Sequence, residues 1–212
     1  MVEWKRACAA LACMLVVCCE ARAAAPLHLT LAEHLSWSLQ PDAREESVWP
    51  PSSRKEFIAA IWPHAERAAR QIGVTPHALA AQAALESGWG RRVAVGTDGQ
   101  TTYNLFGIKA GRSWSGDRTE TATHEYVRGV RRVKVADFRA YESIEECFDD
   151  YVAMLRANPR YASALRHGGT SRRFAARLQL AGYSTDPHYA RKVHDIANSA
   201  VVRSSAAKQT RQ

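Results

Sequence analysis

Cysteine is nearly absent from most of this 212-residue chain. Four of its five cysteines (Cys8, Cys13, Cys18 and Cys19) lie close to the N-terminus, and only Cys147 lies beyond them. One cysteine cannot form an intrachain disulfide, so we expect the body of the protein to be stabilised by packing alone. Cys147 falls on the apolar side of an expected helix and is predicted to be a small core residue.

The spacing typical of a metal site is also absent. The eight histidines are scattered, and no His-x-x-x-His or paired Cys-x-x-Cys motif occurs. A structural or catalytic zinc site is therefore not expected. The chemistry suggested by the other residues needs neither a metal nor an organic cofactor.

No apolar run is long enough to span a bilayer comfortably. The longest, ACAALACMLVVCC (7–19), follows the basic start MVEWKR and precedes small residues in an A-x-A arrangement. This pattern predicts a cleaved secretory signal over 1–25, and hence a periplasmic or secreted protein. The alternatives are an uncleaved anchor and a lipoprotein, but Val16-Val17 before the cysteine pair disfavours lipid attachment.

The charge is unbalanced towards the basic side, with 29 Lys and Arg against 21 Asp and Glu and a formal net charge of +8. A basic exported protein suits a polyanionic partner such as the bacterial cell wall or a membrane surface. Nucleic acid is the other standard partner of a basic protein, but the export signal argues against it.

The remaining length suffices for one domain of ordinary size. Residues 26–52, rich in proline and charge, are predicted to be a linker or N-terminal arm. The domain is expected over 53–202, followed by a flexible polar tail over 203–212.

Two helices are expected at the start of this domain. Apolar residues recur at three- and four-residue steps through 54–72, where Pro63 should kink or break the helix and Gly73 should end it. Thr75 and Pro76 then have the character of an N-cap and a first helical residue. The helix that follows is nearly all alanine and leucine, as in a central core helix, and the residues near one face of it are Leu79, Gln82, Ala83 and Glu86.

A β-hairpin is expected after this pair of helices. RTETATHEYV (118–127) and RRVKVADFRAY (131–141) are extended runs that meet at Arg128-Gly129. Helices resume at Ser143, which forms a capping-box pattern with Glu146. The fold class is therefore α+β, a mainly α-helical, lysozyme-like domain with a small β-hairpin lobe.

Glu86 is the first candidate for catalysis, in the stretch AALESGWG (83–90). The chain can turn away at Gly88, which would let Glu86 and Trp89 face a cleft. A carboxylic acid beside an apolar ring loses hydration, its pKa rises, and it can protonate a glycosidic oxygen near neutral pH. The alternative is a solvated carboxylate at a helix end.

A second carboxylate and a tyrosine are further candidates. Glu120 and Glu125 both lie on the first expected strand at an odd separation, so a regular strand would point them to opposite faces. Only one of them can easily face a cleft, where polysaccharide hydrolases commonly use two carboxylates. Tyr183, in the loop AGYSTDP, could reach the same cleft. These residues also have non-functional interpretations. Glu120 and Glu125 could be exposed strand glutamates, and Tyr183 could be a tyrosine that only packs.

Several motifs occur in the order of one known family, from about Phe57 to Ile196. Together they resemble the glucosaminidase domain of flagellar-type (FlgJ-like) peptidoglycan hydrolases, glycoside hydrolase family 73. The motifs are AAQAALESGWG, YNLFGIKA, WSG, HEYVRG, VKVADFRAY, YVAMLRANPRYA and AGYSTDPHYARKV.

The resemblance implies roles residue by residue. Glu86 matches the catalytic acid, Glu125 the second glutamate on the β-lobe, and Tyr183 the tyrosine that lines the reaction centre. Glu120 matches an accompanying non-catalytic position. The positions implied in the cleft floor and in substrate binding are Trp89, Tyr103, Asn104, Phe106 and Lys109.

The chain also departs from the flagellar proteins. Residues 26–52 are too short for their rod-binding domain, and those proteins reach the periplasm without a signal of this kind. We therefore expect a stand-alone exported hydrolase, with service to another envelope-spanning machine as a hypothesis. His124 stands beside Glu125 where the family often has a hydroxyl residue.

The resemblance implies an endo-β-N-acetylglucosaminidase that cleaves the β-1,4 bond between N-acetylglucosamine and N-acetylmuramic acid, for local cell-wall remodelling. Its partner would be the peptidoglycan glycan strand, and a monomer is the default expectation. Two alternatives remain, a lytic transglycosylase and a non-catalytic wall-binding assembly module.

Overall fold

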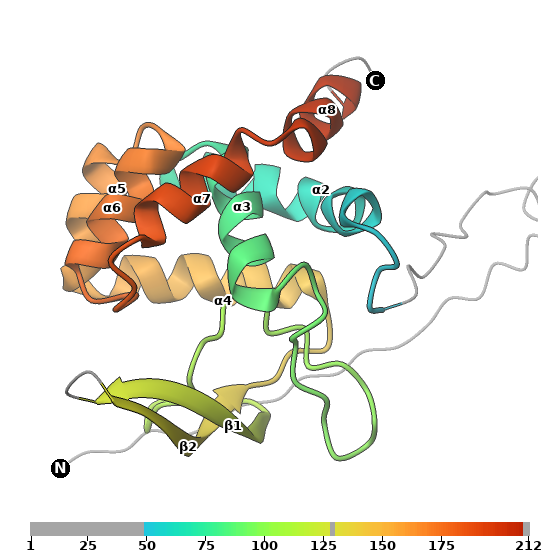
Figure 1. Cartoon of the computed structure of the whole chain (residues 1–212), viewed down its shortest axis with the longest axis vertical. Helices are drawn as coiled ribbons and strands as arrows, with labels where there is room; N and C mark the ends of the chain where they lie inside the picture. The colour runs from blue at the N-terminus through green and yellow to red at the C-terminus, as the bar shows by residue number, and fades with distance from the viewer. Residues whose placement is uncertain (1–48, 128–129, 210–212) are drawn as a thin grey trace, which may run out of the picture. The chain divides into compact units, whose positions relative to one another are not determined.

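A computed structural model describes residues 49–127 and 130–209, with the side chains of 123–132 and 205–209 excepted. A body of helices stands above one β-hairpin (Figure 1). The predicted α+β arrangement, a lysozyme-like helical domain with a β-hairpin lobe, is confirmed. The elements are α2 (Arg54–Ile72), α3 (Pro76–Ser87), β1 (Arg118–Val127), β2 (Val130–Arg139), α4 (Ile144–Ala157), η1 (Pro159–Tyr161), α5 (Ala162–His167), α6 (Ser171–Leu180), α7 (Tyr189–Ala197) and α8 (Ala200–Gln209).

Helix α2 begins and ends as its sequence predicts. The Ser53 side chain accepts a hydrogen bond from the Glu56 amide, and Gly73 closes the helix in the left-handed conformation at φ 69°. A break at Pro63 was one of two expected outcomes, and it does not occur, since one helix runs through this residue. Pro63 is exposed, and buried side chains before and after it, including Ile61 and Ala65, hold the helix against the core.

Helix α3 lies at the centre of the helical body. Thr75 caps it, Pro76 is its first residue, and the stretch 78–84 is wholly buried. It packs against α2, α6, α7 and α8. Four of its buried side chains are alanines within 80–84, and such small side chains let neighbouring helices approach closely. The predicted central core helix is confirmed.

The β-lobe is the antiparallel pair β1–β2, in which Thr119 lies opposite Phe138 and Glu120 opposite Asp137. Thr119 is buried whereas Glu120 is exposed, so the two faces of the strand differ at this end of the hairpin. The two predicted extended runs are confirmed. Their expected junction at 128–129 lies outside the described residues.

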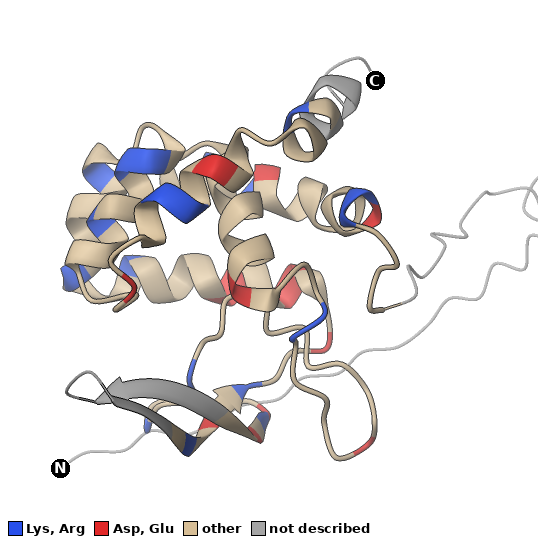
Figure 2. Ribbon diagram, viewed as in Figure 1, with Lys and Arg blue, Asp and Glu red and all other residues tan. Residues whose placement is uncertain are grey.

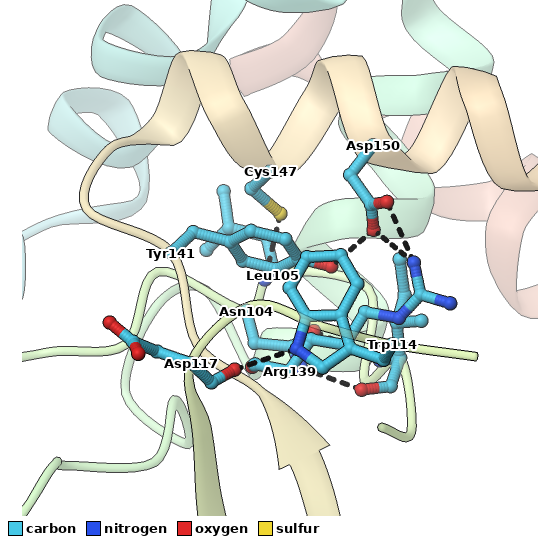
Figure 3. Close-up of polar contacts among 9 residues, drawn as sticks. Asn104, Leu105, Trp114, Asp117, Arg139, Tyr141, Cys147 and Asp150 are labelled. Carbon is cyan, nitrogen blue, oxygen red and sulfur yellow. Dashed lines mark hydrogen bonds and ion pairs between the residues drawn. The ribbon is translucent and has the colours of Figure 1, made fainter. Parts of the chain in front are cut away.

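The base of the hairpin is tied to α4 by a cluster of polar and aromatic side chains (Figure 3). The Arg139 guanidinium contacts both carboxylate oxygens of Asp150, at 2.7 and 2.6 Å, and the Tyr141 hydroxyl donates to the same carboxylate at 2.6 Å. The guanidinium also lies 4.4 Å from the centre of the Trp114 ring. The Asn104 amide donates to the Arg139 carbonyl at 2.8 Å, so the loop before the hairpin is held to the same point.

Helix α4 follows the signals expected for it. Ser143 accepts from the Glu146 amide at the start of α4, and Cys147 is fully buried, as predicted. The Leu105 amide donates to its sulfur at 3.4 Å. Asp186 accepts the Tyr189 amide through its carbonyl as α7 begins.

The edges of the domain differ from the expectation. Helix α8 occupies most of the segment predicted as a flexible tail over 203–212, because Val202 is fully buried in the core and draws the chain end onto the body. At the other edge, within the predicted arm 26–52, Trp49 packs against Phe57 and Tyr103. The predicted signal peptide 1–25 and the arm up to residue 48 lie outside the described residues.

The Asp150 cluster predicts a difference between two neighbouring aspartates. Asp150→Ala leaves Arg139 and the Tyr141 hydroxyl without their acceptor in a partly buried site, so the free energy of unfolding should fall by about 2–3 kcal/mol. Asp149→Ala removes only the pair with Arg67 (2.9 Å), whose side chains are 33 and 50% exposed, and should change it by less than about 1 kcal/mol. Urea denaturation of both variants measures this; equal effects would contradict the anchoring role of Asp150.

Candidate active site

The turn after α3 reverses the chain immediately beyond Glu86. Gly88, Trp89 and Gly90 all have left-handed backbones, at φ 59°, 61° and 82°. The Ser87 hydroxyl donates to the Ala83 carbonyl and accepts from the Gly90 amide, which fixes the turn. A side chain at Gly90 would begin 2.9 Å from the ring of Trp49. The turn therefore leaves Glu86 at the end of a rigid helix, partly buried.

The surroundings of Glu86 favour its protonated form. Burial raises the pKa of its carboxyl from 4.5 to about 7. The hydroxyl of Tyr189 and the guanidinium of Arg92 oppose this rise in pKa, whereas the charge of Asp186 adds to it. A carboxyl with this pKa can donate a proton near neutral pH, which is the property required of a general acid.

Three tyrosines from different elements make up one wall of this site. The ring of Tyr183 lies 6.3 Å from that of Tyr151 and 6.0 Å from that of Tyr189. The Tyr183 hydroxyl donates to the carbonyl of Phe106 at 2.9 Å. Burial raises the pKa of Tyr183 well above its ordinary value, and the nearby Glu86 raises it further. Tyr183 is therefore a neutral phenol whose hydroxyl is held by the backbone of the loop that contains Phe106.

Trp89 packs towards α2. Its ring meets Phe57 edge-on at 5.9 Å, and the Arg54 guanidinium lies 4.8 Å above it. The sequence predicts that this ring desolvates Glu86. Beyond the effect of burial, the charge of Glu86 raises the pKa values of Tyr151, Tyr183 and Tyr189, so these three side chains lie near its carboxyl.

The segment 103–109 forms a tightly bonded loop. The Asn104 side chain bridges to the Ile108 amide and carbonyl, each at 2.9 Å. Phe106 stacks on Tyr151 with ring centres 3.9 Å apart. Asn104 is 6% exposed and Phe106 2%, so these two side chains act within the floor. Tyr103 is partly exposed and Lys109 is exposed, so these two can reach a ligand.

The two candidate glutamates of the β-lobe are both on β1. Glu120 is exposed near the base of the hairpin. Glu125 lies further along the strand, opposite Arg132 in the register, and its side chain is outside what the structure describes. An open pocket of about 690 Å³ lies beside the hairpin base, where its lining includes Arg118, Glu120 and Asp137.

Within residues 49–127 and 130–209, no three His, Cys, Asp or Glu side chains gather as a metal-binding group. In the same part of the chain, no helix combines the length and hydrophobicity needed to cross a bilayer.

Three residues around Glu86 were not singled out for function by the sequence. Arg92 donates to the Leu85 carbonyl at 2.8 Å and brings positive charge near Glu86. Gln82 lies one helical turn before Glu86, and Tyr189 is the first residue of α7. The four-residue spacing could have placed Gln82 on the same helix face as Glu86 from the sequence alone. No signal in the sequence shows that α7 brings Tyr189 close to Glu86.

A helical body with a β-lobe and one carboxyl of raised pKa defines the lysozyme-like class of glycan-cleaving enzymes. The model of the glucosaminidase family, described as mannosyl-glycoprotein endo-beta-N-acetylglucosaminidase, matches residues 62–201. The chain therefore belongs to the glucosaminidase family of glycoside hydrolases.

Relatives of known identity support this membership. The chain is 50% identical over 141 residues to peptidoglycan hydrolase FlgJ of Vibrio cholerae, which is 66% of this chain and 42% of that protein. It thus spans less than half the length of this relative. A peptidoglycan hydrolase mutant from Sphingomonas sp. A1 matches with a TM-score of 0.68 and 44% identity, over 73% of this chain and 99% of that one. The glycoside hydrolase domain of Salmonella typhimurium FlgJ matches with a TM-score of 0.60 and 42% identity, over 74% and 94% of the two chains.

The raised pKa of Glu86 predicts a pH-dependent effect on stability. Below about pH 4.5 Glu86 is protonated in both the folded and the unfolded protein. Between about pH 4.5 and pH 7 it has lost its proton in the unfolded protein but keeps it in the folded one. Stability from this group is therefore present at low pH and is lost as pH rises through the folded pKa. Glu86→Gln should gain about 2–3 kcal/mol relative to the wild type between pH 4 and pH 8.

Urea denaturation at both pH values measures this gain, with the exposed Glu120→Gln as the matched control. A difference between wild type and Glu86→Gln that stays constant from pH 4 to pH 8 would show that the pKa of Glu86 is ordinary.

Proposed function

We propose that this protein is an endo-β-N-acetylglucosaminidase that hydrolyses the β-1,4 bond between N-acetylglucosamine and N-acetylmuramic acid in peptidoglycan. The observation that carries this proposal is the Glu86 carboxyl, whose pKa is raised to about 7 at the end of a core helix. Membership of the glucosaminidase family supports the bond cleaved. The names of relatives, which are peptidoglycan hydrolases, support the substrate.

Glu86 is the general acid in this mechanism. Its proton passes to the glycosidic oxygen as the bond to the sugar carbon breaks, so the leaving group departs as a neutral alcohol. Because the reaction needs the protonated form, activity should decline as pH rises above about 7. The rigid helix and the turn at Gly88 hold the carboxyl in place during this step.

Glu125 and Tyr183 have supporting roles in this mechanism. Glu125 acts either as the base that takes a proton from the attacking water or as an electrostatic support for the positive charge that develops on the sugar. Tyr183 contributes a neutral phenol, fixed by its hydrogen bond to the Phe106 carbonyl, that positions the sugar. Tyr103 and Lys109 are the groups that contact the glycan in this proposal, which the partial exposure of Tyr103 and the exposure of Lys109 support.

A lytic transglycosylase is the second candidate function. It needs one carboxylate and forms an anhydro sugar end without adding water. Glu86 alone would suffice for it, whereas a second glutamate at position 125 favours hydrolysis. A non-catalytic wall-binding module is a third, but such a module has no use for a desolvated acid.

We further propose that the protein acts in the periplasm or outside the cell after cleavage of a signal peptide over 1–25. The basic start and the apolar run 7–19 support this location. The formal net charge, +8 for the whole chain and +7 without residues 1–25, suits an anionic wall. Wall remodelling for an envelope-spanning machine, by a monomer, is the role we infer.

The first test is digestion of purified peptidoglycan, followed by borohydride reduction and mass spectrometry of the fragments. The wild type should release fragments ending in reduced N-acetylglucosamine. Glu86→Gln should lower their rate of release by at least about 100-fold, because the leaving oxygen is no longer protonated. Glu120→Gln, on the exposed face of β1, should act like the wild type.

Each result of this digestion has a distinct meaning. Anhydro-muramyl ends would identify a transglycosylase and overturn the hydrolysis. Binding to the wall without any release, unchanged in Glu86→Gln, would identify a binding module.

The role of Glu125 is tested by comparing substitutions at Glu125 and at Glu120, which lie on the same strand, β1. Glu125→Gln should lower kcat about 100-fold, because the positive charge that develops on the sugar loses its carboxylate, while the melting temperature stays unchanged. The paired variant Glu120→Gln controls for any general effect on β1. Activity of Glu125→Gln within twofold of the wild type would remove this residue from the mechanism.

A further inference from the structure

Two deeply buried polar side chains beside Glu86 have no role in the mechanism proposed above. Gln82 on α3 is 1% exposed, and Tyr189 at the start of α7 is 2% exposed. Neither the Gln82 Nε2 atom nor the Tyr189 hydroxyl has a partner at hydrogen-bond geometry. A buried polar group left unpaired destabilises the folded state, so its retention calls for a physical reason.

The other end of the Gln82 amide is fixed. The Tyr151 hydroxyl donates to Gln82 Oε1 at 2.6 Å. With its oxygen occupied, Gln82 turns its two N–H donors the other way. Tyr189 lies close enough to both Gln82 and Glu86 for each to influence its hydroxyl.

These contacts define a chain with one direction. Tyr151 donates to Gln82. Beyond the effect of burial, Gln82 lowers the pKa of Tyr189 whereas Glu86 raises it, which are the effects of a donor and of an acceptor beside that hydroxyl. Tyr151 itself is held by its stack on Phe106. Tyr151, Gln82 and Tyr189 therefore form a series whose remaining donors can serve Glu86.

We propose that Tyr189 is a positioning residue which, oriented by Gln82, donates a hydrogen bond to the Glu86 carboxylate formed when that residue gives its proton to the leaving sugar. This inference rests on the proposed role of Glu86. Tyr189 does not touch the glycan, and its action is on the acid alone.

The physical reason lies in the change of charge at Glu86. A neutral carboxyl is a modest acceptor, whereas a carboxylate forms a charge-assisted hydrogen bond about twice as strong. The two missing hydrogen bonds, from Gln82 to Tyr189 and from Tyr189 to Glu86, form when the stronger acceptor appears. Donors already in place where charge develops stabilise the transition state without reorganisation.

The other charged and titratable groups near Glu86 do not duplicate this contact. The Arg92 guanidinium is exposed and donates to the Leu85 carbonyl. Asp186 is paired with Lys192 at 2.5 Å. Tyr183 donates to the Phe106 carbonyl, away from the acid. Among the described groups, Tyr189 is thus the donor best placed to serve the carboxylate.

The test compares Tyr189→Phe with Tyr161→Phe by two measurements. Tyr161 is the matched control, because it is a buried tyrosine whose hydroxyl accepts from Arg160. The titration of Glu86 is followed by NMR of protein carrying ¹³C at glutamate carboxyls, with the signal assigned through Glu86→Gln. The rate is followed by release of reduced glycan ends from peptidoglycan.

Loss of the Tyr189 donor should move the midpoint of the Glu86 titration upward by about one pH unit and lower kcat about tenfold. KM should stay within twofold. Tyr161→Phe should leave both readouts at the wild-type value. Gln82→Met, which keeps the Tyr189 hydroxyl but removes its orientation, should produce a smaller shift in the same direction.

A midpoint in Tyr189→Phe that equals that of the wild type would overturn the proposal. So would an equal shift in Tyr161→Phe, which would indicate a general effect of losing a phenol. If Tyr189→Phe does not fold, Gln82→Met decides the matter by the same titration. Failure of the wild type to release glycan ends would refute the proposed function, while the titration would still test the contact between Tyr189 and Glu86.

Discussion

The close approach of other helices to α3 determines the character of the site. Helix α3 buries alanines on all sides, so α2, α6, α7 and α8 can pack against its backbone. The approach of α7 brings Tyr189 over the last turn of α3, and the same packing desolvates Glu86. A larger side chain at Ala83 or Ala84 would push these helices apart and hydrate the acid. The pKa of Glu86 is thus a consequence of small side chains elsewhere on its helix.

The two halves of the candidate site are held in different ways. Glu86 stands on a helix inside the core, whereas Glu125 lies on a hairpin joined to the body at its base. Figure 2 shows acidic and basic residues side by side near that base, where Arg139 and Asp150 form their ion pair. The pair is only 15 and 17% exposed, so water weakens it less than a surface pair. The position of the β-lobe relative to Glu86 therefore depends on this pair together with the hydrogen bonds at the hairpin base, such as the one from the Asn104 amide to the Arg139 carbonyl.

Local signals in the sequence were sufficient for most of the fold. The predicted caps at Thr75 and Ser143 and the paired extended runs act through neighbours a few residues away, and all appear as predicted. Long-range contacts were not predictable in this way. The convergence of Gln82 and Tyr189 on Glu86 depends on how α7 packs on α3, and α8 forms where a polar tail was expected because Val202 finds a place in the core. Glu86 was chosen as a candidate acid from its sequence, but the tyrosines near it come from other elements and needed the packing.

The contact of Trp49 with the turn after α3 affects where the folded unit begins. This ring lies against Phe57 and Tyr103, and it fills the space left open by the missing side chain of Gly90. Residues ahead of the first helix are therefore part of the support beneath the Glu86 turn. A shortened or fused version of the protein that starts at Ser53 would expose apolar ring faces next to the reaction centre, whereas one that retains Trp49 keeps them covered.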